Sequence, residues 1–176
     1  MISKMLIATD GSEHALKAVA FGADIAAKYD AEVVLAHALL HDEVPESLRR
    51  AAEVEYGPLV SAGQPAGGVP TVPHARVPIA EVMPESAEPT TAEIRAVGDW
   101  ILSASEDVAR RHGVTRIKRE ILEGDPAERI VGLVAETGAD VVVTGSRGLS
   151  PLKAALVGSV SSRIAKDAEA TVISVR

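Results

Sequence analysis

The sequence predicts an α/β fold: a Rossmann-like, open parallel sheet of five strands in the order 3-2-1-4-5, with helices on both faces. Short apolar runs alternate along the chain with stretches whose apolar residues recur at helical spacing, and this is typical of parallel strands joined by helices. Three of the five runs are apolar almost throughout, as expected of central strands that are buried on both faces. Hydrophobic residues make up 47% of the 176-residue chain, which is enough for a core of this kind.

The first strand is predicted over residues 4–9 and the second over residues 32–39, which are rich in Val and Leu. Between them the apolar residues recur at helical spacing, which predicts a helix with a buried face. The expected core positions of this helix are Leu16, Val19, Ala20, Ala23 and Ala26.

A long helix is predicted before Gly113, and a third strand over residues 117–122, in which Lys118 and Glu120 alternate with Ile117, Arg119 and Ile121. The expected core positions of the helix are Ile94, Val97, Ile101, Ala104 and Val108. The charged third strand is expected at an edge of the sheet.

A further helix is predicted to begin after Asp125 and to end near Gly138. Asp125 is the expected N-cap, Pro126 suits the first helical position, and Glu128 can reach back to close a capping box. The remaining elements are a strand over 140–144, a helix over 159–166 and a short strand over 171–175.

The order of the strands in the sheet can be predicted from their composition, because only some of them need to be buried on both faces. The first, second and fourth strands are apolar and belong in the centre, whereas the charged third strand and the short fifth strand suit the edges. In the order 3-2-1-4-5 the switch point lies between the carboxyl ends of strands one and four, where such sheets bind ligands. Residues 9–12 and 144–148 are therefore expected to share one crevice.

Composition and charge exclude several classes of protein. The net charge is −7 and no basic stripe offsets it, so we expect neither a nucleic-acid nor a membrane partner. The chain has no cysteine, which excludes disulfides and thiolate metal sites and fits a cytoplasmic location. No stretch approaches the roughly 18 apolar residues of a membrane span.

Residues 41–92 interrupt the alternation of strands and helices, because eight of the ten prolines fall there. Proline denies a segment the hydrogen-bonded interior of a sheet. We therefore expect a single domain over residues 1–176, in which 41–92 is an insertion that packs over the crevice or over a dimer interface.

The strongest chemical signal is a glycine pattern after the fourth strand. Gly145 and Gly148 can adopt positive φ and let backbone N–H groups approach phosphate oxygens without a Cβ in the way. Gly158 and Ser159 then open the last helix, whose free N–H groups and dipole favour an anion. The pattern indicates a phosphate-binding loop; an ordinary turn followed by a capped helix is the alternative. The cations nearby in sequence are Arg147, Lys153 and Arg163.

The run from Gly145 to Val160 resembles the nucleotide-binding signature of the universal stress protein family, G-x2-G-x9-G-[S/T]. Residues 7–12 are similar to that family's first strand and turn. The resemblance covers residues 3–40 and 92–176 and leaves out the Pro-rich middle. It implies an ATP-binding protein, often dimeric, whose relatives take part in stress responses.

The resemblance also implies roles for particular residues. The residues expected around the phosphates and ribose are Gly145, Gly148, Gly158 and Ser159. Those expected beside the nucleotide at the end of the first strand are Ala8 and Asp10, and Ala36 or His37 would border the adenine through the backbone. Their neighbours Thr9, Thr144, Arg147 and Val160 complete the candidate site.

Asp10 has two interpretations. It could accept hydrogen bonds from the ribose or hold a metal-bound water, or it could simply bond the backbone ahead of the first helix. With the family in view we favour the site role. The histidines lack a metal-ligand spacing such as His-x3-His and are expected at the surface or in packing, so no metal ligand is assigned.

Three functions remain open. The first is an ATP-binding regulatory protein, with Mg²⁺ on the nucleotide and an unidentified protein partner. The second is a slow ATP hydrolase or phosphotransferase, and the third is a nucleotide-free dimeric scaffold. Hydrolysis needs a group that positions water and cations that offset charge. No such catalytic group can be named, so binding ranks above turnover. A homodimer is expected through residues 171–175, because an exposed apolar edge strand needs a partner.

Overall fold

The computed structural model describes residues 1–39, 91–148 and 158–176. The Pro-rich stretch predicted at 41–92 lies almost wholly outside the described residues. In chain order the elements are β1 (Lys4–Ala8), α1 (Glu13–Tyr29), β2 (Glu32–Leu39), α4 (Thr91–Arg111), β3 (Ile117–Glu123), α5 (Pro126–Thr137), β4 (Val141–Gly145), α6 (Ser159–Asp167) and β5 (Thr171–Val175). The strands lie where the sequence predicts them, to within one residue at each end.

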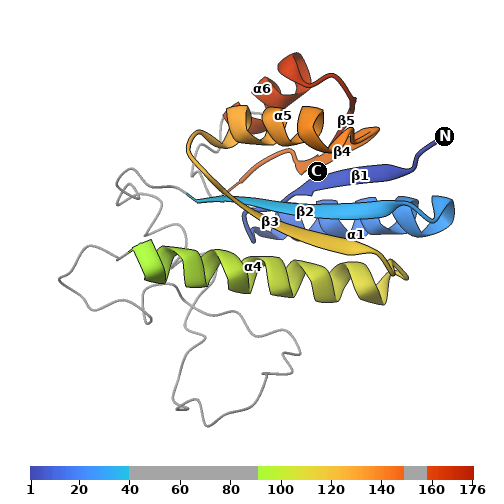
Figure 1. The fold of residues 1–176 in the computed structure, drawn as a ribbon, viewed down its shortest axis with the longest axis horizontal. Coiled ribbons are helices and arrows are strands. Elements are labelled where there is room, and N and C mark those ends of the chain that lie inside the picture. The colour runs from blue at the N-terminus through green and yellow to red at the C-terminus, as the bar shows by residue number, and fades with distance from the viewer. Residues whose placement is uncertain (40–90, 149–157) are drawn as a thin grey trace, which may run out of the picture.

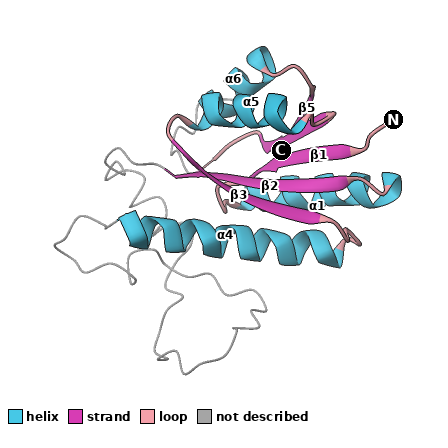
Figure 2. Cartoon of the chain, in the orientation of Figure 1, coloured by secondary structure: helices cyan, strands magenta, loops and turns pink. Residues whose placement is uncertain are grey.

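The strands form one parallel sheet in the order β3-β2-β1-β4-β5, which confirms the predicted fold class. Helices α1 and α4 cover one face, and α5 and α6 cover the other (Figure 1). The charged β3 and the short β5 are the edge strands, as expected from their composition (Figure 2). Among the described residues, no helix is long and apolar enough to cross a bilayer.

The core consists of two apolar layers, one on each face of the sheet. Met5 and Ile7 of β1 belong to the layer under α1 and α4, whereas Leu6 belongs to the layer under α5 and α6. All three side chains are completely buried. Successive residues of a strand point to opposite faces, so an apolar β1 supplies both layers at once.

The face that α4 turns toward the sheet agrees with the predicted one only in part: Ile101 is buried as expected, and the side chain of Ile94 lies outside the described residues. Val97, Ala104 and Val108 are only half-buried. Among the positions of α4 whose burial is described, the buried ones are Gly98, Ile101, Leu102, Ser105 and Ala109. A Cβ on Gly98 would lie 2.9 Å from Leu39 Cδ2, so a small residue lets the helix approach β2 closely. A prediction based on apolar periodicity alone misses such small residues.

Helix α1 packs just as closely on the centre of the sheet. A Cβ on Gly22 would lie 2.7 Å from Ile7 Cδ1 and 3.3 Å from Val143 Cγ2. Ile7 and Val143 are completely buried, on neighbouring strands β1 and β4. By contrast, a Cβ on Gly132 in α5 would meet nothing within 4 Å.

These two glycines allow a matched test of packing. Gly132→Ala should stabilise the protein by about 0.5–1 kcal/mol, because alanine is the better helix former and the site has room. Gly22→Ala gains the same propensity but overpacks a tight core, which typically costs about 1–3 kcal/mol. Urea unfolding should therefore find Gly22→Ala the less stable of the two. Equal stabilisation by both substitutions would contradict the close packing of α1.

Candidate functional site

The turns that follow β1 and β4 meet at the carboxyl edge of the sheet. The two strands are neighbours, with Ile7 in register with Val143. A Cβ on Gly148 would lie 2.5 Å from Asp10 Oδ2, so the backbone of one turn lies against the carboxylate of the other. The structure thus brings together the two turns that the sequence placed in one crevice.

The glycine loop is held by close packing and by short backbone hydrogen bonds. A Cβ on Gly145 would lie 3.1 Å from the backbone nitrogen of Ala15, at the start of α1. The Ser146 N–H donates to the Val175 carbonyl at 2.6 Å, and the Gly158 N–H donates to the Ser146 carbonyl at 2.7 Å. The loop after β4 is therefore fixed to β5 and to the start of α6.

Gly145 and Gly148 leave space for close contacts and do not adopt an unusual backbone conformation. The described glycines with positive φ are Gly11, Gly113, Gly124 and Gly138. The expectation that Gly145 and Gly148 adopt positive φ is therefore wrong. Their missing Cβ atoms instead allow the contacts with α1 and with Asp10.

Helix α6 begins without a side-chain cap. Gly158 is the N-cap residue, with φ −67° and ψ 154°, and within the described part of the chain no side-chain cap hydrogen bond is made. The Ser161 hydroxyl donates to the Gly158 carbonyl at 3.0 Å and is directed at an acceptor rather than at those N–H groups. Ser159 and Val160 are exposed. An uncapped first turn offers its N–H groups to an anion.

Asp10 bonds the backbone of its turn through one carboxylate oxygen, as expected. The second carboxylate oxygen lies toward the glycine loop. Its Oδ1 accepts a hydrogen bond from the Ser12 N–H at 3.0 Å, and Ser12 in turn caps α1. Its Oδ2 is the atom that lies against Gly148. The two interpretations of Asp10 are therefore compatible.

Thr9 is held from two directions by buried polar groups. His37 Nδ1 lies 2.9 Å from the Thr9 carbonyl, and because a carbonyl only accepts, Nδ1 carries the proton. The Ser105 hydroxyl of α4 donates to Thr9 Oγ1 at 3.3 Å. Ser105 is completely buried and His37 is 9% exposed. Both β2 and α4 therefore fix the turn that carries Asp10.

The burial of His37 lowers its pKa below the ordinary value of a histidine. The hydrogen bond to the Thr9 carbonyl and the charge of Asp10 oppose this shift but are smaller. We conclude that the imidazole is neutral at pH 7.

The backbone contacts expected of Ala36 or His37 are already used within the sheet. The Ala36 carbonyl accepts the Thr9 N–H at 2.9 Å, and His37 is in register with Ile121 of β3. Backbone groups alternate between the two sides of a strand, so those of Ala38 point to the side of β1. The register of β1 with β2 ends at Ala36, which leaves Ala38 beyond its last pair. The sequence alone does not show which residue of β2 faces β1 beyond the last pair, because this depends on the register.

Thr144 contributes a buried hydroxyl to the end of β4. The residue is 4% exposed, and Oγ1 has no hydrogen-bond partner within the described part of the chain. A buried polar atom without a partner is costly, and a bound water or ion is one of the explanations for it.

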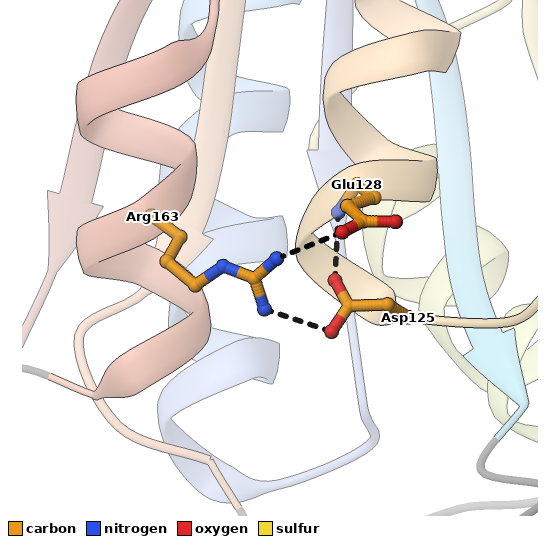
Figure 3. Close-up of polar contacts among 3 residues, drawn as sticks. All are labelled: Asp125, Glu128 and Arg163. Carbon is orange, nitrogen blue, oxygen red and sulfur yellow. Dashed lines mark hydrogen bonds and ion pairs between the residues drawn. The ribbon is translucent and has the colours of Figure 1, made fainter.

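Arg163 of α6 points to α5 and not to the glycine loop (Figure 3). It donates to Asp125 Oδ2 at 2.7 Å and to Glu128 Oε1 at 3.4 Å. Asp125 caps α5 as predicted, accepting the Glu128 N–H at 2.9 Å, but the Glu128 carboxylate lies toward Arg163. The hydrogen bond from Arg163 is the main cause that lowers the pKa of Asp125, and the same bond raises the pKa of Arg163.

A broad, open hollow lies at the opposite edge of the sheet, where β4 and β5 begin. Asp140, Ala168 and Thr171 are among the residues that line it. The strands' amino ends meet there, and open α/β sheets bind their ligands at the carboxyl ends. We therefore place the candidate site at the edge that carries the glycine loop.

These features define a doubly wound α/β protein with a glycine loop and an uncapped helix start at the switch point of its sheet. The chain belongs to the universal stress protein family, whose model matches residues 1–176. It is 30% identical to the stress response protein NhaX of Bacillus subtilis, over 98% of this chain and 97% of that protein.

Solved structures share the fold. A universal stress protein in complex with cAMP is 24% identical, with a TM-score of 0.60 over 99% of this chain and 97% of the other. The universal stress protein from Archaeoglobus fulgidus in complex with dAMP is 18% identical, with a TM-score of 0.58 over 100% and 98% of the two chains. Both of those proteins bind adenine nucleotides.

The buried imidazole leads to a pH dependence of stability. In the unfolded chain a histidine has a pKa of about 6.5, whereas burial lowers the pKa of folded His37. Below about pH 6.5 the unfolded chain therefore binds a proton at this histidine more readily than the folded protein does. The free energy of unfolding falls as the pH falls toward the pKa of His37 in the folded protein. Melting temperatures between pH 7.5 and 5 should fall less for His37→Gln than for the wild type.

The control for this measurement is His112→Gln, which removes a half-exposed histidine that contacts Asp24. An equal pH dependence in His37→Gln and the wild type would show that His37 is not the group concerned.

Proposed function

We propose that this chain is a regulatory protein that binds an adenine nucleotide, ATP with Mg²⁺, at the carboxyl edge between β1 and β4. The observation that carries the proposal is the contact of Gly148 with Asp10, next to the uncapped start of α6. A glycine loop and a free helix start are the groups that bind phosphates in other α/β proteins. The membership of the chain in the universal stress protein family supports the same ligand class.

In this proposal the phosphates bind the loop of Gly145 and Gly148 and the first turn of α6, Gly158 to Val160. Arg147, which is exposed beside them, adds a positive charge. The buried hydroxyl of Thr144, which has no partner among the described residues, fits a polar ligand at this edge.

The nucleoside would lie over the ends of β1 and β2. In this proposal Asp10 would accept a hydrogen bond from the ribose, and Ala8 and Thr9 would lie beneath it at the strand end. The backbone groups of Ala38, one residue after the expected pair of Ala36 and His37, point to this side. With aromatic residues at 2% of the chain, contact with the adenine would come from backbone and aliphatic groups.

Mg²⁺ would arrive with the nucleotide rather than bind a site of its own. Within the described ranges, no group of three or more His, Asp or Glu side chains is arranged to hold a metal. Magnesium in nucleotide sites is typically bound by one or two carboxylates together with phosphates and water. Asp10 can supply one such carboxylate.

Binding ranks above turnover for a physical reason. Arg163, a cation that could have offset charge on a transferred phosphoryl group, is engaged by Asp125 and Glu128. Without a named group that positions water, slow hydrolysis remains the second candidate. A nucleotide-free scaffold is the third candidate function. It would give no role to the contact between Gly148 and Asp10.

ATP should raise the melting temperature of the wild type. Ligand at about 100 times its dissociation constant stabilises a protein by roughly 2.7 kcal/mol, which is about 5–11 °C for a chain of this size. Gly148→Val should abolish most of this rise, because its Cβ would lie 2.5 Å from Asp10 Oδ2 and displace that carboxylate. The measurement is a thermal shift with MgATP, relative to each variant without ligand.

Gly132→Val is the matched control, because a Cβ there meets nothing within 4 Å. It should keep the rise with ATP. A wild type that shows no rise with millimolar ATP, and that carries no copurified nucleotide, would refute the binding proposal. Sustained turnover on the order of 1 per second or faster would instead support an enzyme.

We also propose that the protein is a cytoplasmic, single-domain homodimer that signals to an unidentified protein partner. Within the described residues β5 pairs only with β4, so its other edge is open to a second copy. Thr171 and Val175 bond toward β4, through the Asp140 carbonyl and the Ser146 N–H. By alternation, the N–H groups of Val172 and Ser174 point to the open edge.

Ser174→Pro should therefore convert a dimer to a monomer while leaving the bonds to β4 in place. Proline removes the outward N–H, and the Ser174 side chain is exposed, so the fold should survive. Light scattering at micromolar concentration measures the change, with Ser174→Ala as the control. A monomeric wild type, or a dimer unaffected by Ser174→Pro, would reject pairing through β5.

A further inference from the structure

Helix α6 is attached to the sheet by few buried side chains. All nine of its residues are described, and of these only Ser161 and Ile164 are buried. Ile164 is its one residue in the apolar layer under α5 and α6. A helix this short has little stability of its own, and few buried apolar contacts hold it in place. The direction of α6 must therefore depend on other contacts as well.

Arg163 makes a contact that can set this direction, because it joins α6 to the start of α5 (Figure 3). Its Nη1 lies 2.7 Å from Asp125 Oδ2, and its Nη2 lies 3.4 Å from Glu128 Oε1. The guanidinium is planar, so two acceptors on its fork fix its orientation as well as its position. Arg163 precedes Ile164, and adjacent residues of α6 thus contact α5 and the sheet.

The carboxylate of Asp125 is an acceptor whose position is already fixed. Its Oδ1 accepts the Glu128 N–H at 2.9 Å, which is the N-cap bond of α5, while Oδ2 accepts from Arg163. A side chain that is held by a backbone hydrogen bond loses little further freedom when it also forms an ion pair. Asp125 therefore ties the position of α6 to that of α5.

Arg163 lies directly after the part of α6 that adjoins the glycine loop. The Gly158 carbonyl accepts the Ser162 N–H at 3.0 Å, and the Gly158 N–H donates to the Ser146 carbonyl at 2.7 Å. Within the described residues this first turn has no side-chain cap. A rotation of α6 about Ile164 would therefore change where the free N–H groups of the turn point.

We propose that Arg163 is a positioning residue for the first turn of α6. By pairing with Asp125 and Glu128 it holds this turn beside the glycine loop. The guanidinium is directed at α5, and its charge is offset by the two carboxylates, so it acts through the helix and not on a ligand. The benefit to a bound phosphate rests on the proposed function, whereas the placement of α6 stands on these contacts alone.

The experiment compares the binding of MgATP with that of adenosine, which has no phosphate, by calorimetry on the nucleotide-free protein. Arg163→Gln and Asp125→Asn should each weaken the binding of MgATP by roughly three- to tenfold, as expected of residues that act through another contact. Both should leave the binding of adenosine unchanged. Arg163→Lys keeps the charge and can keep one ion pair, so it should lose less affinity than Arg163→Gln.

Asp125→Asn distinguishes positioning from a direct effect of charge. Asparagine caps a helix as well as aspartate does, but its one side-chain oxygen is used by the Glu128 N–H. The variant therefore keeps the cap of α5, loses the tie to Arg163 and makes this region more positive. If Arg163 acted on the phosphates through its charge, Asp125→Asn would bind MgATP more tightly. A positioning role predicts weaker binding.

The matched control is Arg129→Gln, which removes the same charge from an exposed position of α5. It should bind both ligands like the wild type. The side chains of Arg163 and Asp125 are partly exposed, so their pair contributes little to the free energy of unfolding. Urea unfolding of Arg163→Gln, Asp125→Asn and the control should therefore give similar midpoints.

Hydrogen exchange of the Gly158 and Ser162 amides tests the placement of α6 without a ligand. Both amides should exchange faster in Arg163→Gln and Asp125→Asn than in Arg129→Gln and the wild type. Unchanged exchange would overturn the proposal. An unchanged affinity for MgATP, a loss that adenosine shares, or tighter MgATP binding by Asp125→Asn would overturn it too. Faster exchange in the variants of a protein that binds no nucleotide would retain the placement of α6 by Arg163 and reject the proposed function.

Discussion

The position of β1 between β2 and β4 is the constraint on which the carboxyl edge of the sheet depends. Met5, Leu6 and Ile7 are completely buried, so β1 can lie only in the centre, with a helical layer on each face. Its carboxyl end must then lie beside that of β4, and the turns that follow the two strands meet. The contact of Asp10 with Gly148 is a consequence of where the apolar β1 is buried.

The fold could be predicted from the sequence because the strands differ in composition. The apolar β1, β2 and β4 require burial on both faces, and the charged residues of β3 exclude it from the centre. The buried face of α4 could not be predicted in the same way. It is formed partly by Gly98 and Ser105, whose small size matters only once the distance to β2 and to Thr9 is known.

The sequence predicts which segments of the chain meet at the candidate site. It does not predict the directions of the individual side chains and backbone groups there. Strand order alone brings the turns at residues 9–12 and 145–148 together. The direction of the Arg163 side chain depends on where α5 begins. Whether the backbone groups of Ala38 are left unpaired by β1 depends on the register of β2 with β1. Such properties arise from pairs of elements distant in sequence, so no local pattern carries them.

The contact of α4 with the first turn has an experimental use. Ser105 bonds Thr9, and a Cβ on Gly11 would lie 3.1 Å from Ile101 Cγ1, so α4 touches this turn at two places. Trp100, the one tryptophan of the chain, is half-buried beside Ile101 on the same helix. Its intrinsic fluorescence therefore comes from a single position on the helix that contacts this turn. Emission can follow the packing of α4 in real time, without a label.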